Sequence, residues 1–144
     1  MICKGSFDET WNSVLNYLGA KSYKTIKLDK KNGIIETKEI SFIRNFTFED
    51  DRGIPKDSTA YMVVALAYYG PSYYYAENPM YLKIRIQVLL EKLGEGTKIS
   101  VKLLPFAVRV AGLRENEKNK YYKDWDKVVR SSGVLENELF SQLR

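Results

Sequence analysis

Apolar residues near the start of the chain recur at helical spacing, and they fall on one helical face: Phe7, Trp11, Val14, Leu15 and Leu18. Ser6 and Glu9 stand three residues apart, the spacing of a capping box, in which the two side chains satisfy free amides at the helix start. Gly19 suits the left-handed conformation that often ends a helix. The pattern predicts an amphipathic helix over residues 6–19, with a short strand before it in residues 1–4.

The next segments are typical of strands. Residues 22–28 and 33–42 flank the turn Asp29–Gly33, in which Asn32-Gly33 readily takes positive φ, so a hairpin is expected. The returning strand is predicted to continue through Phe46 and Phe48. Residues 49–58 are a loop by composition, and residues 61–69 form a largely apolar strand.

The clearest strand covers residues 80–90, because apolar and polar residues alternate strictly along it. A glycine-rich turn over residues 93–96 leads into residues 97–104, which alternate in the same way. The two segments predict a hairpin with one packed face and one wet face. Pro105 suits an edge strand or a bulge, and beyond it Phe106, Val108 and Val110 either extend the second strand or bend it.

The end of the chain has helical periodicity, carried by Tyr121, Trp125, Val128, Ser132, Leu135, Leu139 and Leu143. The segment Ser131–Gly133 interrupts this pattern. Two helices and one bent helix both remain open, because glycine inside a helix costs about 1 kcal/mol relative to alanine.

The predicted order of elements is therefore β-α-β-β-β-β-β-α, within a single α+β domain over residues 1–144. An antiparallel sheet with one apolar face needs a cover, and the two terminal helices are the candidates. We expect a curved antiparallel sheet packed on a long C-terminal helix, with a short N-terminal helix. This arrangement is called a helix-grip fold.

Composition removes most catalytic chemistry from consideration. The chain has no His and one Cys, so His-based catalysis, His-based zinc sites and an intramolecular disulfide are excluded. Paired carboxylates are the remaining acid–base candidates, and each pair lies in a polar run that indicates solvent exposure: Asp50 with Asp51, Asp124 with Asp126, and Glu136 with Glu138. We expect no enzyme activity, no metal site and no cofactor, and we expect Cys3 to be a structural cysteine of the core or of an edge strand.

The net charge of +5 raises the question of an anionic partner. Acidic residues interleave with the lysines in the densest basic runs, residues 27–31 and 117–120. This distribution argues against a nucleic-acid or membrane-binding patch and indicates a solvated surface of mixed charge.

Tyrosine is the most distinctive residue type, since 11 of the residues are Tyr. A cluster surrounds a Gly-Pro-Ser turn, and its members are Tyr68, Tyr69, Tyr73, Tyr74, Tyr75 and Tyr81. Tyrosine is enriched at protein interfaces, because its rigid ring gives large contact area at low entropic cost. Two interpretations stay open: an exposed surface that binds a protein partner, and a set of rings that cover one end of the core.

The first forty residues resemble a known family. Phe7-Asp8-Glu9-Thr10-Trp11 opens the first helix, a strand with Tyr23 and Ile26 follows, and Asp29 to Ile35 turns the chain back. This order is similar to that of bacterial envelope lipoproteins with helix-grip domains, including the BamC (NlpB) family, which assists the machinery that inserts outer-membrane β-barrels. The lipid-accepting signal and the Tyr-rich loop depart from that pattern.

The resemblance implies a non-enzymatic scaffold or binding domain on the periplasmic side of the bacterial envelope, held to the membrane only through a lipid anchor that this sequence lacks. If Met1 is the native start, a cytoplasmic location is expected instead. Helix-grip folds that resemble the START and pollen-allergen group suggest an alternative, a carrier of a small apolar ligand held between the sheet and the C-terminal helix. The lining of that cavity would include Ile84, Ile86, Val101, Trp125 and Val129.

Overall fold

The computed structural model describes the backbone of residues 1–41, 46–64, 80–110 and 129–143, and the side chains of these residues except at 41, 64, 80–83, 105–110 and 129. The chain divides into two compact units. The first comprises Met1–Ile40, Arg85–Leu104 and Leu135–Arg144, and the second comprises Ser41–Ile84 and Pro105–Val134. The prediction that the whole chain is one domain stays a prediction.

The first helix, α1 (Phe7–Ala20), begins where the sequence predicts it. The Ser6 side chain accepts a hydrogen bond from the Glu9 backbone N–H, and Glu9 Oε2 accepts one from the Ser6 backbone N–H at 2.9 Å, which completes the capping box. The predicted end at Gly19 is wrong: α1 continues to Ala20, and Ser22 takes the left-handed conformation, with φ of 60°. Trp11, Val14 and Leu18 of the predicted apolar face are buried.

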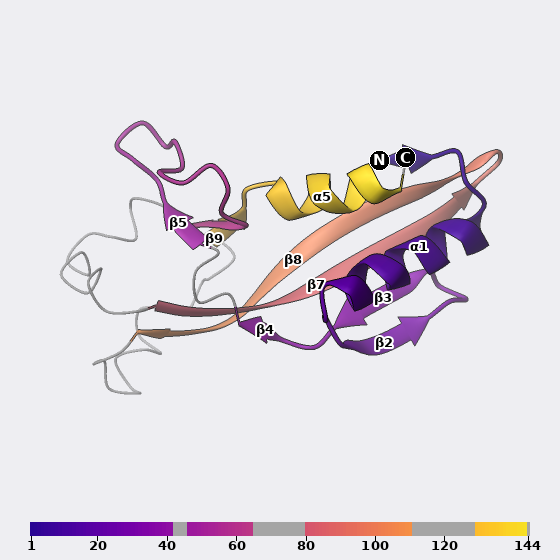
Figure 1. Ribbon diagram of the computed structural model, residues 1–144, viewed down its shortest axis with the longest axis horizontal. Helices are drawn as coiled ribbons and strands as arrows, with labels where there is room; N and C mark the ends of the chain where they lie inside the picture. Colours follow the sequence, from indigo (N-terminus) through magenta and orange to yellow (C-terminus); the bar gives the residue numbers. More distant parts are fainter. Residues whose placement is uncertain (42–45, 65–79, 111–128, 144) are drawn as a thin grey trace. The chain divides into compact units, whose positions relative to one another are not determined.

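The main sheet has the strand order β1-β8-β7-β3-β2 (Figure 1). Its strands are β1 (Ile2–Cys3), β2 (Thr25–Asp29), β3 (Ile34–Thr37), β7 (Met80–Leu93) and β8 (Gly96–Val110), and the short β4 (Ile40–Ser41) also pairs with β7. The pairs β1–β8, β2–β3 and β3–β7 are antiparallel. The α+β class and the antiparallel sheet are therefore confirmed.

The long strands alternate as predicted. Ile84, Ile86 and Val88 of β7 are fully buried, whereas Gln87 is half-buried and Leu89 is exposed. On β8, Ile99 and Leu103 are buried, while Lys98 and Lys102 are exposed. Strand β8 continues through Pro105, so the predicted extension to Val110 is confirmed.

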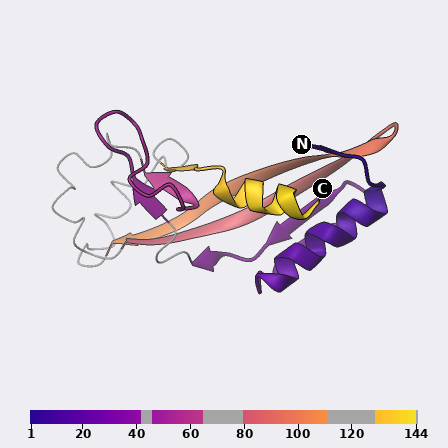
Figure 2. The same cartoon turned by 45° about the horizontal axis from the view of Figure 1, so that its top comes forward.

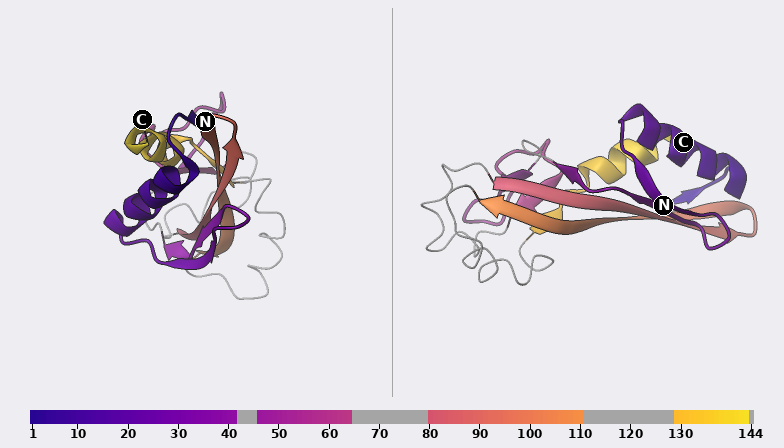
Figure 3. Two further views of the ribbon diagram at one scale, coloured as in Figure 1. Left: turned by 90° about the vertical axis from the view of Figure 1, so that its right-hand side faces the viewer. Right: turned by 90° about the horizontal axis from the view of Figure 1, so that it is seen from below.

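Within the first unit, α1 and the second helix, α5 (Val134–Gln142), lie on the same face of the main sheet (Figures 2 and 3). Leu135 and Leu139 of α5 are fully buried, as are Ile35 of β3 and Ile99 of β8. These apolar side chains form the core of the unit, and the sheet-and-two-helix plan agrees with the prediction.

A second, three-stranded sheet belongs to the other unit and was not expected. Its strands are β5 (Phe46–Phe48), β6 (Met62–Val64) and β9 (Val129–Ser131), in the order β5-β6-β9. Strand β5 is parallel to β6, and β9 is antiparallel to it. The prediction that Phe46 and Phe48 continue the strand begun at Gly33 is thus wrong, because that segment is divided among β3, β4 and β5.

The C-terminal helix is shorter than predicted. Residues 129–131 form a strand, because their backbone pairs with Met62–Val64, and α5 then spans 9 residues. Gly133 has φ of 87°, and the Ser132 N–H donates to Tyr61 O at 2.9 Å, so this serine continues the contact with β6. Residues 121–128 of the predicted helical pattern lie outside the described residues.

Candidate binding surfaces

The tyrosine cluster falls mostly in a part of the chain that the structure does not describe. Residues 68, 69 and 73–75 lie outside the described residues, and Tyr81 is placed only as a position on β7. A role of these tyrosines in binding stays a prediction.

The predicted cavity lining is only partly described. Ile84 and Ile86 have no exposed surface, and Val101 on β8 is half-buried. Val129 is a position on β9, and Trp125 lies outside the described residues. The three pockets described in the first unit are lined by other residues.

A polar contact joins the two helices of the first unit, and the sequence did not reveal it. The Tyr17 hydroxyl donates to Glu138 Oε2 at 3.3 Å, and Lys21 Nζ lies 3.3 Å from the same oxygen. Lys21 also lies over the Tyr17 ring, 5.9 Å from its centroid. Burial, reinforced by the charge of Glu138, raises the pKa of the nearby Tyr23 hydroxyl. The cluster fixes α5 against α1.

Two pockets are lined in part by Ser13 of α1, and the smaller of them is also lined by Tyr17 and Lys21 of this contact. The larger, of about 680 Å³, is formed by the first residues of the chain, the first turns of α1 and Leu143. The other, of about 450 Å³, lies between α1 and Gln142. Volumes of this size fall in the range of small-molecule sites. Sequence periodicity gives no signal for such a pocket, because it depends on how two distant helices meet.

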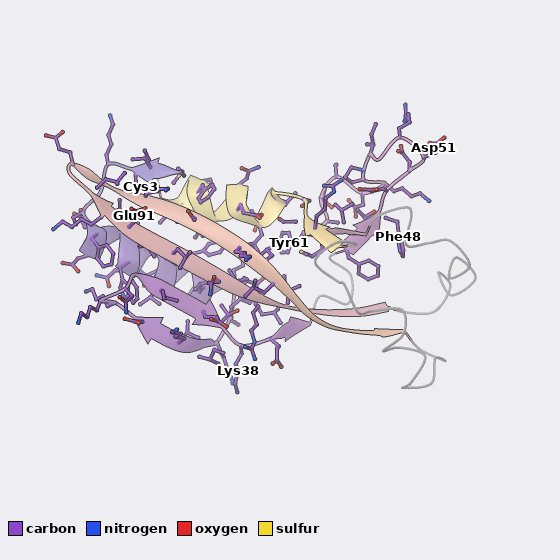
Figure 4. All side chains as sticks on the ribbon, turned by 180° about the vertical axis from the view of Figure 1, so that it is seen from behind. Cys3, Lys38, Phe48, Asp51, Tyr61 and Glu91 are labelled. Atoms are coloured by element: carbon purple, nitrogen blue, oxygen red, sulfur yellow. The ribbon has the colours of Figure 1, made fainter. Side chains whose placement is uncertain are left out.

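Cys3 lies on β1 beside β8 and lines the larger pocket (Figure 4). The residue is 5% exposed, and its Sγ lies 3.5 Å from Leu143 O, to which it donates. Burial raises the pKa of the Cys3 thiol, so the thiolate that nucleophilic chemistry requires is disfavoured. The expectation of a structural cysteine in the core or in an edge strand is confirmed, since Cys3 is buried and belongs to β1 at one end of the strand order.

Most acidic groups with shifted pKa values hold turns and caps, whereas the pKa of Asp8 is lowered by its contact with Lys30. The Ser6 hydroxyl lowers the pKa of Glu9, and the Asn32 side chain lowers that of Asp29. The Ile54 backbone N–H lowers the pKa of Asp50 by donating to Oδ1 at 2.9 Å. A general acid needs the opposite shift, towards neutral pH.

The other candidate carboxylates have separate roles. Asp51, the neighbour of Asp50, is exposed at the tip of the loop (Figure 4). Glu138 takes part in the helix contact, and Glu136 is half-buried on α5. Residues 124 and 126 lie outside the described residues. Among the residues that the structure describes, no three acidic or cysteine side chains gather into a metal-binding group.

The edge strand β2 carries exposed apolar side chains. Ile26 is 47% exposed and Leu28 is 54% exposed, although both belong to a strand of the main sheet. Lys24, Lys27 and Lys31 are close to them in the sequence and are exposed. The sequence pattern did not single out this surface, because it does not say which strand lies at the edge.

No protein-family model matches the chain, and no curated protein matches it. The resemblance to the BamC family therefore stays a prediction. Neither described helix has the length and apolar character needed to cross a bilayer.

Proposed function

We propose that the protein is a non-catalytic binding or scaffold domain that acts through contacts with another protein. The observation that carries this proposal is the pair of exposed apolar side chains, Ile26 and Leu28, on an edge strand. An exposed sheet edge is a template for pairing with another chain, and exposed apolar side chains add contact area. The shifted carboxyl groups support a role without catalysis, since caps and turns hold them ionised.

The proposed setting is the periplasmic side of the bacterial envelope, where a lipoprotein of the BamC type would assist outer-membrane assembly. This part of the proposal is supported by the resemblance of the first forty residues. Fractionation of cells of the source organism tests it, since the protein is expected with the envelope and not with the cytosol.

The tyrosine cluster is the second proposed contact surface, on the strength of its composition. The triple change of Tyr73, Tyr74 and Tyr75 to Ser is expected to leave the melting temperature nearly unchanged and to abolish partner capture in pull-downs. The matched control changes the same three residues to Phe, which keeps the rings. A large loss of stability in the Ser variant would show that the rings belong to the core.

A second candidate function is a carrier of a small apolar ligand, and the pocket of about 680 Å³ beside β1 favours it. Its test is the binding of an apolar fluorescent dye by the wild type and by Ser13→Trp, which would fill the shared wall of the two pockets. The control is Ser58→Trp, on an exposed loop of the other unit. Equal dye binding by both variants would argue against a ligand site in this pocket.

A further inference from the structure

Strand β2 is the last strand of the main sheet on the side opposite β1 (Figure 1). It pairs with β3 on one side, and no residue that the structure describes pairs with its other side. An open edge of this kind presents unpaired backbone N–H and C=O groups to solvent.

The register of the sheet shows which groups face the open edge. Leu90 N–H donates to Gly33 O at 2.7 Å, so the carbonyl group of Gly33 faces β7. Backbone groups alternate in direction along a strand, so those of Ile35, two residues later, also face β7. Leu28 stands opposite Ile35 and therefore directs its own N–H and C=O away from β3. Leu28 thus offers the open edge one donor, one acceptor and an exposed apolar side chain.

The backbone groups of Thr25 also face the open edge. Lys38 N–H donates to Lys24 O at 2.7 Å, so the carbonyl group of Lys24 faces β3. Thr25, the next residue, stands opposite Thr37 and therefore directs its own backbone groups away from β3. A bulge separates Thr25 from Lys27, so the outward groups of Thr25 and Leu28 are three residues apart instead of two. A regular strand cannot pair with both sites in continuous register. The edge therefore favours a short partner segment centred on Leu28.

The charge of the edge indicates what that segment carries. Lys24, Lys27 and Lys31 are exposed and form no ion pair with any residue that the structure describes. Lys30 differs, since its Nζ lies 2.8 Å from Asp8 Oδ1. Lysines on an edge repel a second copy of the same edge, and they attract an acidic chain.

We propose that the β2 edge binds an extended acidic segment of a partner protein, in which acidic and apolar residues alternate. The segment pairs with the outward backbone groups of Leu28, its apolar side chains cover the Leu28 side chain, and its carboxylates meet the three lysines. This inference rests on the proposed function, since it names the chemistry of the partner. Electrostatic attraction makes the binding sensitive to salt.

The test uses a fluorescent peptide of about eight residues with alternating valine and glutamate, and its control alternates valine and lysine. Fluorescence anisotropy is expected to show binding of the acidic peptide alone, with affinity that falls as NaCl is raised from about 50 to about 300 mM. Equal binding of the basic peptide would overturn the proposal. So would tighter binding of a single-stranded oligothymidine, because the edge would then be a general anion site.

Charge-reversed variants locate the binding. The triple variant K24E/K27E/K31E is expected to lose about tenfold or more in affinity for the acidic peptide, because opposite charges become like charges. The control variant has the same net charge and alters three exposed lysines away from the edge: Lys4, Lys56 and Lys102. Equal losses in the two variants would overturn the assignment to β2.

The backbone contact has its own test. Leu28→Pro removes an N–H that β3 does not use and is expected to weaken binding about tenfold. If circular dichroism shows that this variant is unfolded, Leu28→Ser replaces it and is expected to weaken binding through the lost apolar contact. Unchanged affinity in a folded variant contradicts the proposal.

Failure of this inference is distinguishable from failure of the proposed function. A partner protein that K24E/K27E/K31E captures as strongly as the wild type would overturn the β2 assignment and leave the protein-binding function intact. Peptide binding at β2 without any protein partner for the wild type would contradict the proposed function.

Discussion

The Tyr17 hydroxyl donates to Glu138 Oε2 at 3.3 Å, and this bond joins α1 to α5 across 121 positions of the sequence. Both helices lie on the same face of the main sheet (Figure 3), and the bond ties them together there. The polar contact is therefore part of the packing of the two helices in the first unit.

A double-mutant cycle measures this contact. Tyr17→Phe and Glu138→Gln are each expected to lower the free energy of unfolding by about 1 kcal/mol, because each weakens a half-buried hydrogen bond. The double variant is expected to lose less than the sum, which gives a coupling energy of at least about 0.5 kcal/mol in urea unfolding. Strict additivity would show that the bond contributes nothing to stability.

Ile35 and Leu28 face each other across β2 and β3 but differ in burial, so they form a matched pair. Ile35→Ala is expected to cost about 2–5 kcal/mol in the free energy of unfolding, because it opens a cavity in a fully buried site. Leu28→Ala is expected to cost less than about 1 kcal/mol, because half of the side chain is already in water. Similar costs would mean that Leu28 is a core residue and is not available to a partner.

Gly33 and Gly53 both have positive φ, but only one is crowded. A Cβ at Gly33 would collide with the backbone oxygen of Leu90, whereas a Cβ at Gly53 would meet open space. Gly53→Ala is expected to cost about 1–2 kcal/mol for the left-handed backbone alone. Gly33→Ala is expected to cost clearly more in thermal or urea unfolding, and equal costs would contradict the close approach of the turn to β7.

Acid is expected to destabilise the protein through its capping carboxyl groups. The pKa of Glu9 is lower in the folded state, because the Ser6 hydroxyl and N–H bind the ionised form. A lowered folded pKa stabilises the fold above the unfolded pKa, which is about 4.3 for a glutamate, and that stabilisation is lost as pH falls through the folded value. The urea midpoint should therefore decline between about pH 5 and about pH 3.

The variant Glu9→Gln should show a shallower decline than the wild type, since it has no carboxyl group to protonate at the cap. Glu95→Gln, in the exposed turn between β7 and β8, is the control and should follow the wild-type pH dependence. Identical pH profiles for all three proteins would exclude the capping box as a source of acid sensitivity.

Local signals were sufficient for some elements and not for others. The start of α1 was predictable, because Ser6 and Glu9 satisfy each other's amides within one turn. The strand nature of Val129–Ser131 was not, because it depends on pairing with Met62–Val64, more than sixty positions earlier in the sequence. Tertiary pairing here overrode the helical spacing of the side chains.

The candidate surfaces likewise include features that the sequence pattern predicts and features that it does not predict. The periodicity of β7 predicted the burial of Ile84 and Ile86. It gave no indication that Ile26 and Leu28 are exposed, because exposure at an edge depends on the order of strands in the sheet. The pocket at Ser13 likewise depends on the meeting of two helices that are distant in sequence.

Native mass spectrometry of the protein purified gently from its source separates the two candidate functions most directly. We expect a complex with a second polypeptide, which dissociates as salt is raised and is absent for the charge-reversed β2 variant. An adduct with the mass of a small apolar molecule, found across several preparations without any polypeptide partner, would instead identify the protein as a carrier.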